Sequence, residues 1–258
     1  DKDTNASSCC GSGGCSTEVY NIMSESYKGL NGYHADADLG LGCGLPTEFA
    51  KIKSGDVVLD LGSGAGNDAF VARSITGDSG KVIGVDFTET MIQKARKNAE
   101  KLKLNNVEFR YGDIENLPVS DESIDVVISN CVLNLVPNKK QALKEIFRVL
   151  KKDGHFSISD IVITDILPLE LQSAAEMYAG CVAGALQKDI YLDIIRECGF
   201  SNITVQKEKP IVIPEDILKN YLSEKELTAY KAKQNIIYSI TVYAEKKADV
   251  CCSGSGCC

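Results

Sequence analysis

The stretch DVVLDLGSGAGNDAFVARSIT, residues 56–76, decides the fold. Its apolar run at 56–61 leads into the glycine-rich turn GSGAG, and residues 67–76 then have the pattern of a helix. The next segment, KVIGVD at 81–86, has the composition of a second buried strand. A strand, a tight turn, a helix and another strand in succession predict one βαβ unit of a parallel sheet.

The same alternation continues along the chain. A helix is predicted from Glu89, with its apolar stripe formed by Met91, Ile92, Ala95, Ala99 and Leu102. Further strands are predicted at 107–113, 124–130 and 155–162, with a helix at 139–152 before the last of them. Five strands separated mainly by helices indicate a parallel, doubly wound α/β sheet with helices on both faces. In such sheets a ligand lies beyond the carboxyl ends of the strands.

Two more strands, at 203–209 and 235–247, bring the expected total to seven. Between them, residues 214–231 are predicted as a helical insertion opened by Pro214. Weak helical patterning covers 19–30, a helix running into a small-residue loop is expected at 167–186, and an amphipathic helix at 188–200. The chain is accordingly divided into a Cys/Gly/Ser-rich flexible tail (1–16), a capping segment (17–50), a cofactor-binding core (51–165), a C-terminal part (166–247) and a Cys-rich tail (248–258).

Composition excludes several classes of protein. Among 258 residues, 28 Lys and Arg face 36 Asp and Glu, and this net charge of −8 argues against a protein that follows phosphate backbones. No run of 18 apolar residues predicts a transmembrane helix, and the N-terminal stretch lacks the basic and apolar regions of a signal peptide. We therefore expect a cytoplasmic protein with no nucleic-acid or membrane partner.

The cysteines fall into two populations. Seven of the 11 lie in the first 15 and last eight residues, and only Cys43, Cys131, Cys181 and Cys198 lie between. Two His in the chain cannot supply the usual Cys/His zinc spacing, and neither tail has a CxxC…CxxC pattern. The length and the clustering of the cysteines also exclude a secreted disulfide scaffold. For the tails, soft-metal capture and a flexible extension remain equally open.

The glycine-rich turn reads Asp60-Leu61-Gly62-Ser63-Gly64-Ala65-Gly66. A dinucleotide fingerprint would need glycine where Asn67 stands, and no GK[ST] of a phosphate-binding Walker loop follows. The acid-x-Gly-x-Gly-x-Gly pattern instead resembles that of class I methyltransferases, which use S-adenosylmethionine. The resemblance implies that Asp86 binds the ribose hydroxyls, that Asp113 lies beside the adenine, and that Asn130 faces the methionine part. The cofactor residues expected on this basis are Asp60, Gly62, Ser63, Gly64, Asn67, Asp86, Phe87, Met91, Asp113, Ile114, Glu115 and Asn130.

Each of these residues also has a purely structural interpretation. Asp86 could cap a helix, Met91 could belong to the core, and Asp113 could be a turn residue. Their occurrence in order at successive strand ends favours the cofactor interpretation.

Three cysteines are candidates for the substrate site. Cys131 follows Asn130 at the end of a strand and therefore near the methyl group, while Cys43 and Cys181 lie in glycine-rich settings. His34 and His155 are placed by no motif, and Cys198, within an amphipathic helix, is expected in the core. Three thiolates alone form a soft, sulfur-only site, which suits a trivalent metalloid such as arsenic, whose lone pair can attack a methyl group.

The sequence resembles arsenite S-adenosylmethionine methyltransferases over residues 33–200. The resemblance lies in YHADADLGLGCGLP (33–46), LDLGSGAGNDAF (59–70), IDVVISNCVLNLVP (124–137), FRVLKKDGHFSISDI (147–161) and AGCVAGAL (179–186). It implies that Cys43, Cys131 and Cys181 bind As(III), which arrives as a thiol adduct, and that an external reductant such as thioredoxin or a small thiol is needed. It also implies a redox partner for Cys43, for which Cys15 is a candidate. The other candidate accessory thiols are Cys251, Cys252, Cys257 and Cys258.

Two other functions remain open from the sequence. One is a quinone-type C- or O-methyltransferase of the same fold, with inert cysteines. The other is a Cys-rich protein that sequesters a metalloid.

Overall fold

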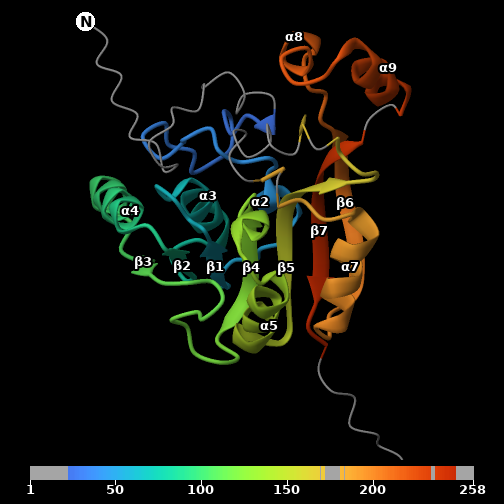
Figure 1. Cartoon of the computed structure of the whole chain (residues 1–258). Helices are drawn as coiled ribbons and strands as arrows, with labels where there is room; N and C mark the ends of the chain where they lie inside the picture. The colour runs from blue at the N-terminus through green and yellow to red at the C-terminus, as the bar shows by residue number, and fades with distance from the viewer. Residues whose placement is uncertain (1–22, 169, 172–180, 183, 234–235, 248–258) are drawn as a thin grey trace, which may run out of the picture.

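A single mixed sheet of seven strands organises the chain (Figure 1). The computed structural model describes residues 23–168, 170–171, 181–182, 184–233 and 236–247. The strand order is β3-β2-β1-β4-β5-β7-β6, and only β7 runs antiparallel to its neighbours. The predicted fold class is therefore confirmed. The strands are β1 (Val57–Leu61), β2 (Lys81–Asp86), β3 (Val107–Tyr111), β4 (Ile124–Asn130), β5 (Leu150–Ile163), β6 (Ser201–Pro210) and β7 (Ile237–Glu245).

Helices cover both faces of the sheet because alternate strand residues point to opposite sides. On one face, Val58 and its neighbours pack against α3 (Asn67–Thr76) and α4 (Glu89–Lys101). On the other face, Leu59 and Leu61 belong to a core shared with α5 (Lys139–Val149) and α7 (Lys188–Glu197). The shorter helices are α2 (Pro46–Phe49), the 3-10 turn η1 (Leu133–Leu135), α8 (Glu215–Leu218) and α9 (Glu224–Ala232).

The glycine-rich turn connects β1 to α3 as predicted. Gly66 precedes the first residue of α3 with a φ of 100°, a left-handed conformation that costs glycine little. An added Cβ there would lie 2.7 Å from the ring of Phe70. The turn is therefore held tightly against the helix that it starts.

The helical insertion predicted at 214–231 is present, but not as one continuous helix. It is two short helices, because Ser223 starts α9 with a capping box: Glu226 N–H donates to its side chain, and the Glu226 carboxylate accepts from the Ser223 N–H. Both helices lie at the same end of the sheet as residues 23–45 (Figure 1).

The helical patterning predicted at 19–30 is helical only at Met23 in its described part. Residues 24–27 have no regular structure and are followed by turns, in which Gly29 has a φ of 99°. Tyr27 instead packs with Leu45 and Val71. Most of the helix expected at 167–186, and both cysteine-rich tails, lie outside the described residues.

No helix within the described ranges is long and apolar enough to span a membrane.

Candidate active site

Cys43, Cys131 and Cys181, from three separate segments, lie in one buried apolar cluster. The thiols of Cys181 and Cys43 both act on the Cys131 thiol, and each raises its pKa. The Cys181 thiol also lies 3.4 Å from the Cys131 carbonyl oxygen, to which it donates. The sequence prediction that these three residues converge agrees with this placement, while their role as arsenic ligands remains a prediction.

Two of these thiols, Cys43 and Cys131, are held in the protonated form at neutral pH. Burial raises the pKa of Cys43, and hydrogen bonding to Cys181 and Cys43, together with burial, raises the pKa of Cys131 well above its usual value. In the part of the chain that the structure describes, no three His, Cys, Asp or Glu side chains are arranged to hold a metal ion. A ligand of the three sulfurs must therefore displace their protons and bring the sulfurs into its own geometry.

The backbone around Cys43 is fixed from two sides. Asn130 Oδ1, at the end of β4, accepts hydrogen bonds from the N–H groups of Cys43 (3.0 Å) and Gly44 (3.3 Å). From β7, the Ser239 hydroxyl donates to the Cys43 carbonyl oxygen at 2.6 Å. The sheet thus positions a cysteine that precedes all of its strands.

The glycines on either side of Cys43 are required by close packing. A Cβ on Gly42 would lie 2.5 Å from Asn130 Nδ2, and one on Gly44 would lie 2.5 Å from Ser159 Oγ. The Gly-Cys-Gly pattern therefore lets the backbone approach the sheet rather than supplying flexibility.

Cys131 has an uncommon backbone conformation. Its φ is 62°, a left-handed value that is rare for residues other than Gly, Asn and Asp. Its N–H donates to the carbonyl oxygen of Ser159 on β5 at 2.7 Å, which holds the turn in place. Such strained positions are concentrated at functional sites because the surrounding structure must maintain them.

Asn134 in η1 orients the Cys181 segment. Its Nδ2 donates to the carbonyl oxygens of Ile161 (2.6 Å) and Cys181 (3.0 Å). Each of the three thiols is therefore held by hydrogen bonds to the backbone of its own segment.

The glycine-rich loop contains buried polar atoms without partners. Asp60 Oδ2, Ser63 Oγ and Asn67 Oδ1 accept or donate no hydrogen bond within the described residues. A buried polar atom that lacks a hydrogen bond costs free energy and calls for an explanation such as a ligand. Three of them along one loop fit a polar cofactor.

Acidic side chains gather beside this loop. Burial, followed by the negative charges of Asp68 and Asp86, raises the pKa of Asp60 well above its usual value. Burial raises the pKa of Asp68 to about 6. Asp86 accepts from the N–H groups of Gly64 (2.9 Å) and Thr88 (2.8 Å). Since negative charge accumulates here, the loop suits a ligand that carries positive charge, as the sulfonium and amino groups of S-adenosylmethionine do.

Comparison with known proteins places the chain in a family. A methyltransferase-domain family model matches residues 52–199. An arsenite methyltransferase of Halobacterium salinarum is 40% identical over 95% of this chain, and one of Aquipseudomonas alcaligenes is 32% identical over 86%. The solved structure of an arsenic(III) S-adenosylmethionine methyltransferase from Chlamydomonas reinhardtii matches with a TM-score of 0.65 and 32% identity, over 80% of this chain and 67% of that one.

The chain belongs to the arsenite methyltransferase family.

It spans 64% of the length of each of the two curated relatives. S-adenosylmethionine is the cofactor of this family of methyltransferases, and the unpartnered atoms of the glycine-rich loop fit it. The family assignment thus agrees with the resemblance seen in the sequence.

The other expected cofactor residues of this arsenite methyltransferase family member have varied surroundings. Phe87, after β2, has 70% of its surface exposed, whereas Met91 in α4 is buried. Asp113 accepts from the Glu115 N–H in an exposed turn, and Ile114 lies in the core. Glu115 Oε1 accepts from the Asn138 N–H, next to the start of α5. Their contacts with cofactor remain predictions.

Sequence reasoning missed four polar residues near the two sites: Tyr27, Asp68, Asp160 and Ser239. Asp160 is fully buried on β5, where the Tyr191 hydroxyl donates to it at 3.3 Å and the N–H groups of Ile161 and Asn134 also donate to it. The one available signal was Asp160 itself, an acidic residue within the apolar strand pattern at 155–162.

Cys198 is half-buried rather than buried in the core, and its thiol lies 3.6 Å from the Lys140 carbonyl oxygen. The candidate accessory thiols Cys15, Cys251, Cys252, Cys257 and Cys258 lie outside the described residues. His155 contacts the Ala50 carbonyl oxygen at 2.6 Å and does not belong to the thiol cluster.

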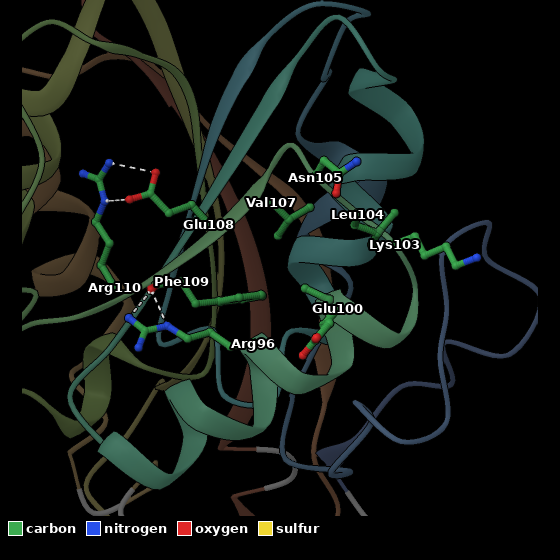
Figure 2. Close-up of a pocket in the computed structure, with 10 residues that line it drawn as sticks. Arg96, Glu100, Lys103, Leu104, Asn105, Val107, Glu108, Phe109 and Arg110 are labelled. Carbon is green, nitrogen blue, oxygen red and sulfur yellow. Dashed lines mark hydrogen bonds and ion pairs between the residues drawn. The ribbon is translucent and has the colours of Figure 1, made fainter.

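A cavity of about 730 Å³ lies between α4 and the edge strand β3 (Figure 2). Arg96 donates to the Phe109 carbonyl oxygen, and Arg110 pairs with Glu108. These cations already have partners, and the cavity begins at the amino end of β3, away from the thiols. We therefore do not assign the chemistry of the protein to this cavity.

Replacing Gly44 by alanine is expected to disturb the Cys43 segment, since the added methyl would overlap Ser159, whose hydroxyl is hydrogen-bonded to Thr241 at 2.8 Å. Overpacking of this kind costs about 1–3 kcal/mol of unfolding free energy. Because the Cys43 segment is displaced, the affinity of Gly44→Ala for arsenite should also fall, as measured by titration of the thiols with arsenite. In Gly40→Ala the added methyl meets nothing within 4 Å, so the substitution strains only the left-handed backbone at Gly40 (φ 66°), and arsenite affinity should stay unchanged. Equal affinities for the two variants would contradict the packing argument.

Proposed function

We propose that this protein transfers the methyl group of S-adenosylmethionine to trivalent arsenic held by Cys43, Cys131 and Cys181. The observation that carries the proposal is the convergence of three thiols, from segments far apart in the sequence, into one buried cluster. The turn that carries Cys131 packs against a glycine-rich loop with unpartnered polar atoms. The names and substrates of the relatives support the same activity.

The site would first capture arsenite by thiol exchange. Each cysteine sulfur forms a bond to arsenic and its proton leaves with the thiol that had carried the arsenic, so charge and atoms balance. The apolar surroundings of the cluster favour a neutral arsenic trithiolate over free ionic arsenite. Sulfur ligands suit this soft acceptor, and no histidine competes for it.

The cofactor supplies an electrophilic methyl group on a sulfonium sulfur. Asp60, Ser63 and Asn67 would hold its polar groups, with Asp86 at the end of β2. The three cysteines would aim the arsenic lone pair toward the loop. Because this nucleophile carries no proton, no general base is needed, and positioning in line can contribute on the order of 7–11 kcal/mol.

The finer parts of the proposal concern partners and location. Arsenite would arrive as a thiol adduct, and thioredoxin or a small thiol would act as the external reductant. Cys15, Cys251, Cys252, Cys257 and Cys258 are candidate accessory thiols, and Cys15 is the candidate redox partner of Cys43. The reaction would serve arsenic detoxification in the cytoplasm, without nucleic-acid or membrane partners.

The direct test is product analysis by mass spectrometry. The full chain, arsenite, S-adenosylmethionine and a dithiol reductant are expected to yield methylated arsenic together with S-adenosylhomocysteine. The matched control is Cys198→Ser, which removes a thiol outside the cluster and should leave product formation unchanged. Absence of methylated arsenic under these conditions would overturn the proposed function.

A further inference from the structure

A chain of hydrogen bonds connects the cofactor loop to the thiol cluster. Asp68 lies in the first turn of α3, directly after the glycine-rich loop and Asn67. The Tyr27 hydroxyl lies 2.7 Å from Asp68 Oδ2, to which it donates. Asn130 Nδ2 donates to the Tyr27 oxygen at 2.5 Å and also lies 3.2 Å from Asp68 Oδ2. The amide of Asn130 is therefore tied to the helix that follows the cofactor loop.

The same amide holds the cysteine segment. In addition to its two bonds from the N–H groups of Cys43 and Gly44, Asn130 donates from Nδ2 to the Gly44 carbonyl oxygen at 2.8 Å. The polar atoms of Asn130 are thus occupied by protein groups on both sides. Any displacement of Asp68 or Tyr27 must change the position of Asn130 and with it the Cys43 backbone.

A second contact runs through the strained turn. Val132 follows Cys131, and a Cβ added to Gly62 would lie only 2.4 Å from Val132 Cγ2. The glycine-rich loop and the turn that carries Cys131 are therefore packed directly against each other. Because tightly packed groups cannot move independently, the two contacts leave few arrangements in which one site changes alone.

We propose that Asn130 and Tyr27 are positioning residues that couple the cofactor loop to the Cys43 thiol, so that cofactor and arsenite bind with positive cooperativity. This inference rests on the proposed function. Binding at the loop orders Asp68 and Tyr27, and through Asn130 places the Cys43 sulfur for capture of arsenic. Linkage requires the effect to be reciprocal, so arsenite must tighten cofactor binding by the same factor.

The coupling is measured with ligands that do not react. S-adenosylhomocysteine binding to the full chain is titrated with and without arsenite, and arsenite binding with and without S-adenosylhomocysteine. We expect each ligand to tighten the other by about fivefold or more, with equal factors in the two directions. Tyr27→Phe removes the hydroxyl that connects Asp68 to Asn130, and its coupling factor should fall to within about twofold of unity, while Asn130 still holds Cys43.

Asp68→Ala breaks the same connection at its other end and should lose the coupling as well, which keeps the test decisive if one variant folds poorly. Tyr33→Phe is the matched control, since Tyr33 lies in the same segment but its hydroxyl interacts with Asp38 instead. It should retain the full factor. Independent binding in the unaltered chain, or unchanged coupling in both Tyr27→Phe and Asp68→Ala, would overturn the inference. Failure of arsenite to bind at all would instead overturn the proposed function.

Discussion

Replacing Cys131 by serine is expected to lower arsenite-dependent methyl transfer by roughly 100-fold or more, the order of loss seen when reacting groups are misplaced by about 1 Å. Cys131 lies in the same buried cluster as Cys43 and Cys181, and its thiol interacts with both of theirs. A serine oxygen is a poor ligand for a soft metalloid, and arsenic held by Cys43 and Cys181 alone would lose the fixed direction of its lone pair.

The measurement is the initial rate of methylated arsenic formation at saturating cofactor. S-adenosylhomocysteine affinity, measured in parallel, should stay within about threefold, because the substitution leaves the glycine-rich loop in place. Cys198→Ser should show the unaltered rate. A Cys131→Ser rate close to that of the unaltered chain would exclude the three-thiol site, and full activity on an organic acceptor would favour a quinone-type methyltransferase.

Replacing Asp160 by asparagine is expected to stabilise the protein at alkaline pH. Burial raises the pKa of Asp160 to about 7 from an ordinary value of 3.8. Between these values the folded chain keeps a proton that the unfolded chain releases, so the unfolding free energy falls as the pH rises from about 4 to 7. About three pKa units correspond to about 4 kcal/mol, which is lost in full above pH 7.

Asparagine keeps an oxygen acceptor for the donors around this position, Tyr191 among them, and removes the charge. Denaturant unfolding at pH 8 should therefore show a gain of up to about 4 kcal/mol for Asp160→Asn, whereas at pH 4 the gain should nearly vanish. Lys139 is the cation whose charge most favours the ionised form, and Lys139→Met serves as the control, with a loss at pH 8. If the difference in unfolding free energy between Asp160→Asn and the unaltered chain were the same at pH 4 and pH 8, ionisation of the buried Asp160 carboxyl would be excluded as its cause.

Several helices and strands could be predicted from the local pattern of apolar and polar residues. The strands at 81–86 and 124–130 and the helix at 67–76 begin and end where the sequence predicts, since apolar runs stop at glycine or polar residues there. The division of the insertion at Ser223 was not predicted, although Ser223 and Glu226 have the S-x-x-E spacing of a capping box. The convergence of the three thiols was predicted from the strand-end position of Cys131, from the glycine-rich settings of Cys43 and Cys181, and from the family resemblance, and could not have come from their spacing alone.

The hydrogen bonds that position the candidate site could not be predicted in the same way. Tyr27 is separated from Asp68 by 41 residues and from Asn130 by 103. Neither periodicity nor a motif relates residues at such distances, since their contact is a product of the strand order. Asn130 was expected at the strand end, but its engagement with Cys43 becomes visible only when the segment before the first strand is folded onto the sheet.

The bond between Ser239 and the Cys43 carbonyl oxygen joins residues 196 positions apart. Contacts of such large sequence separation form late, because the intervening chain must first be ordered. During synthesis Cys43 therefore emerges long before β7. A nascent chain that lacks β7 therefore carries Cys43 without the Ser239 hydrogen bond that positions it, and the complete thiol cluster forms only after β7 has been made.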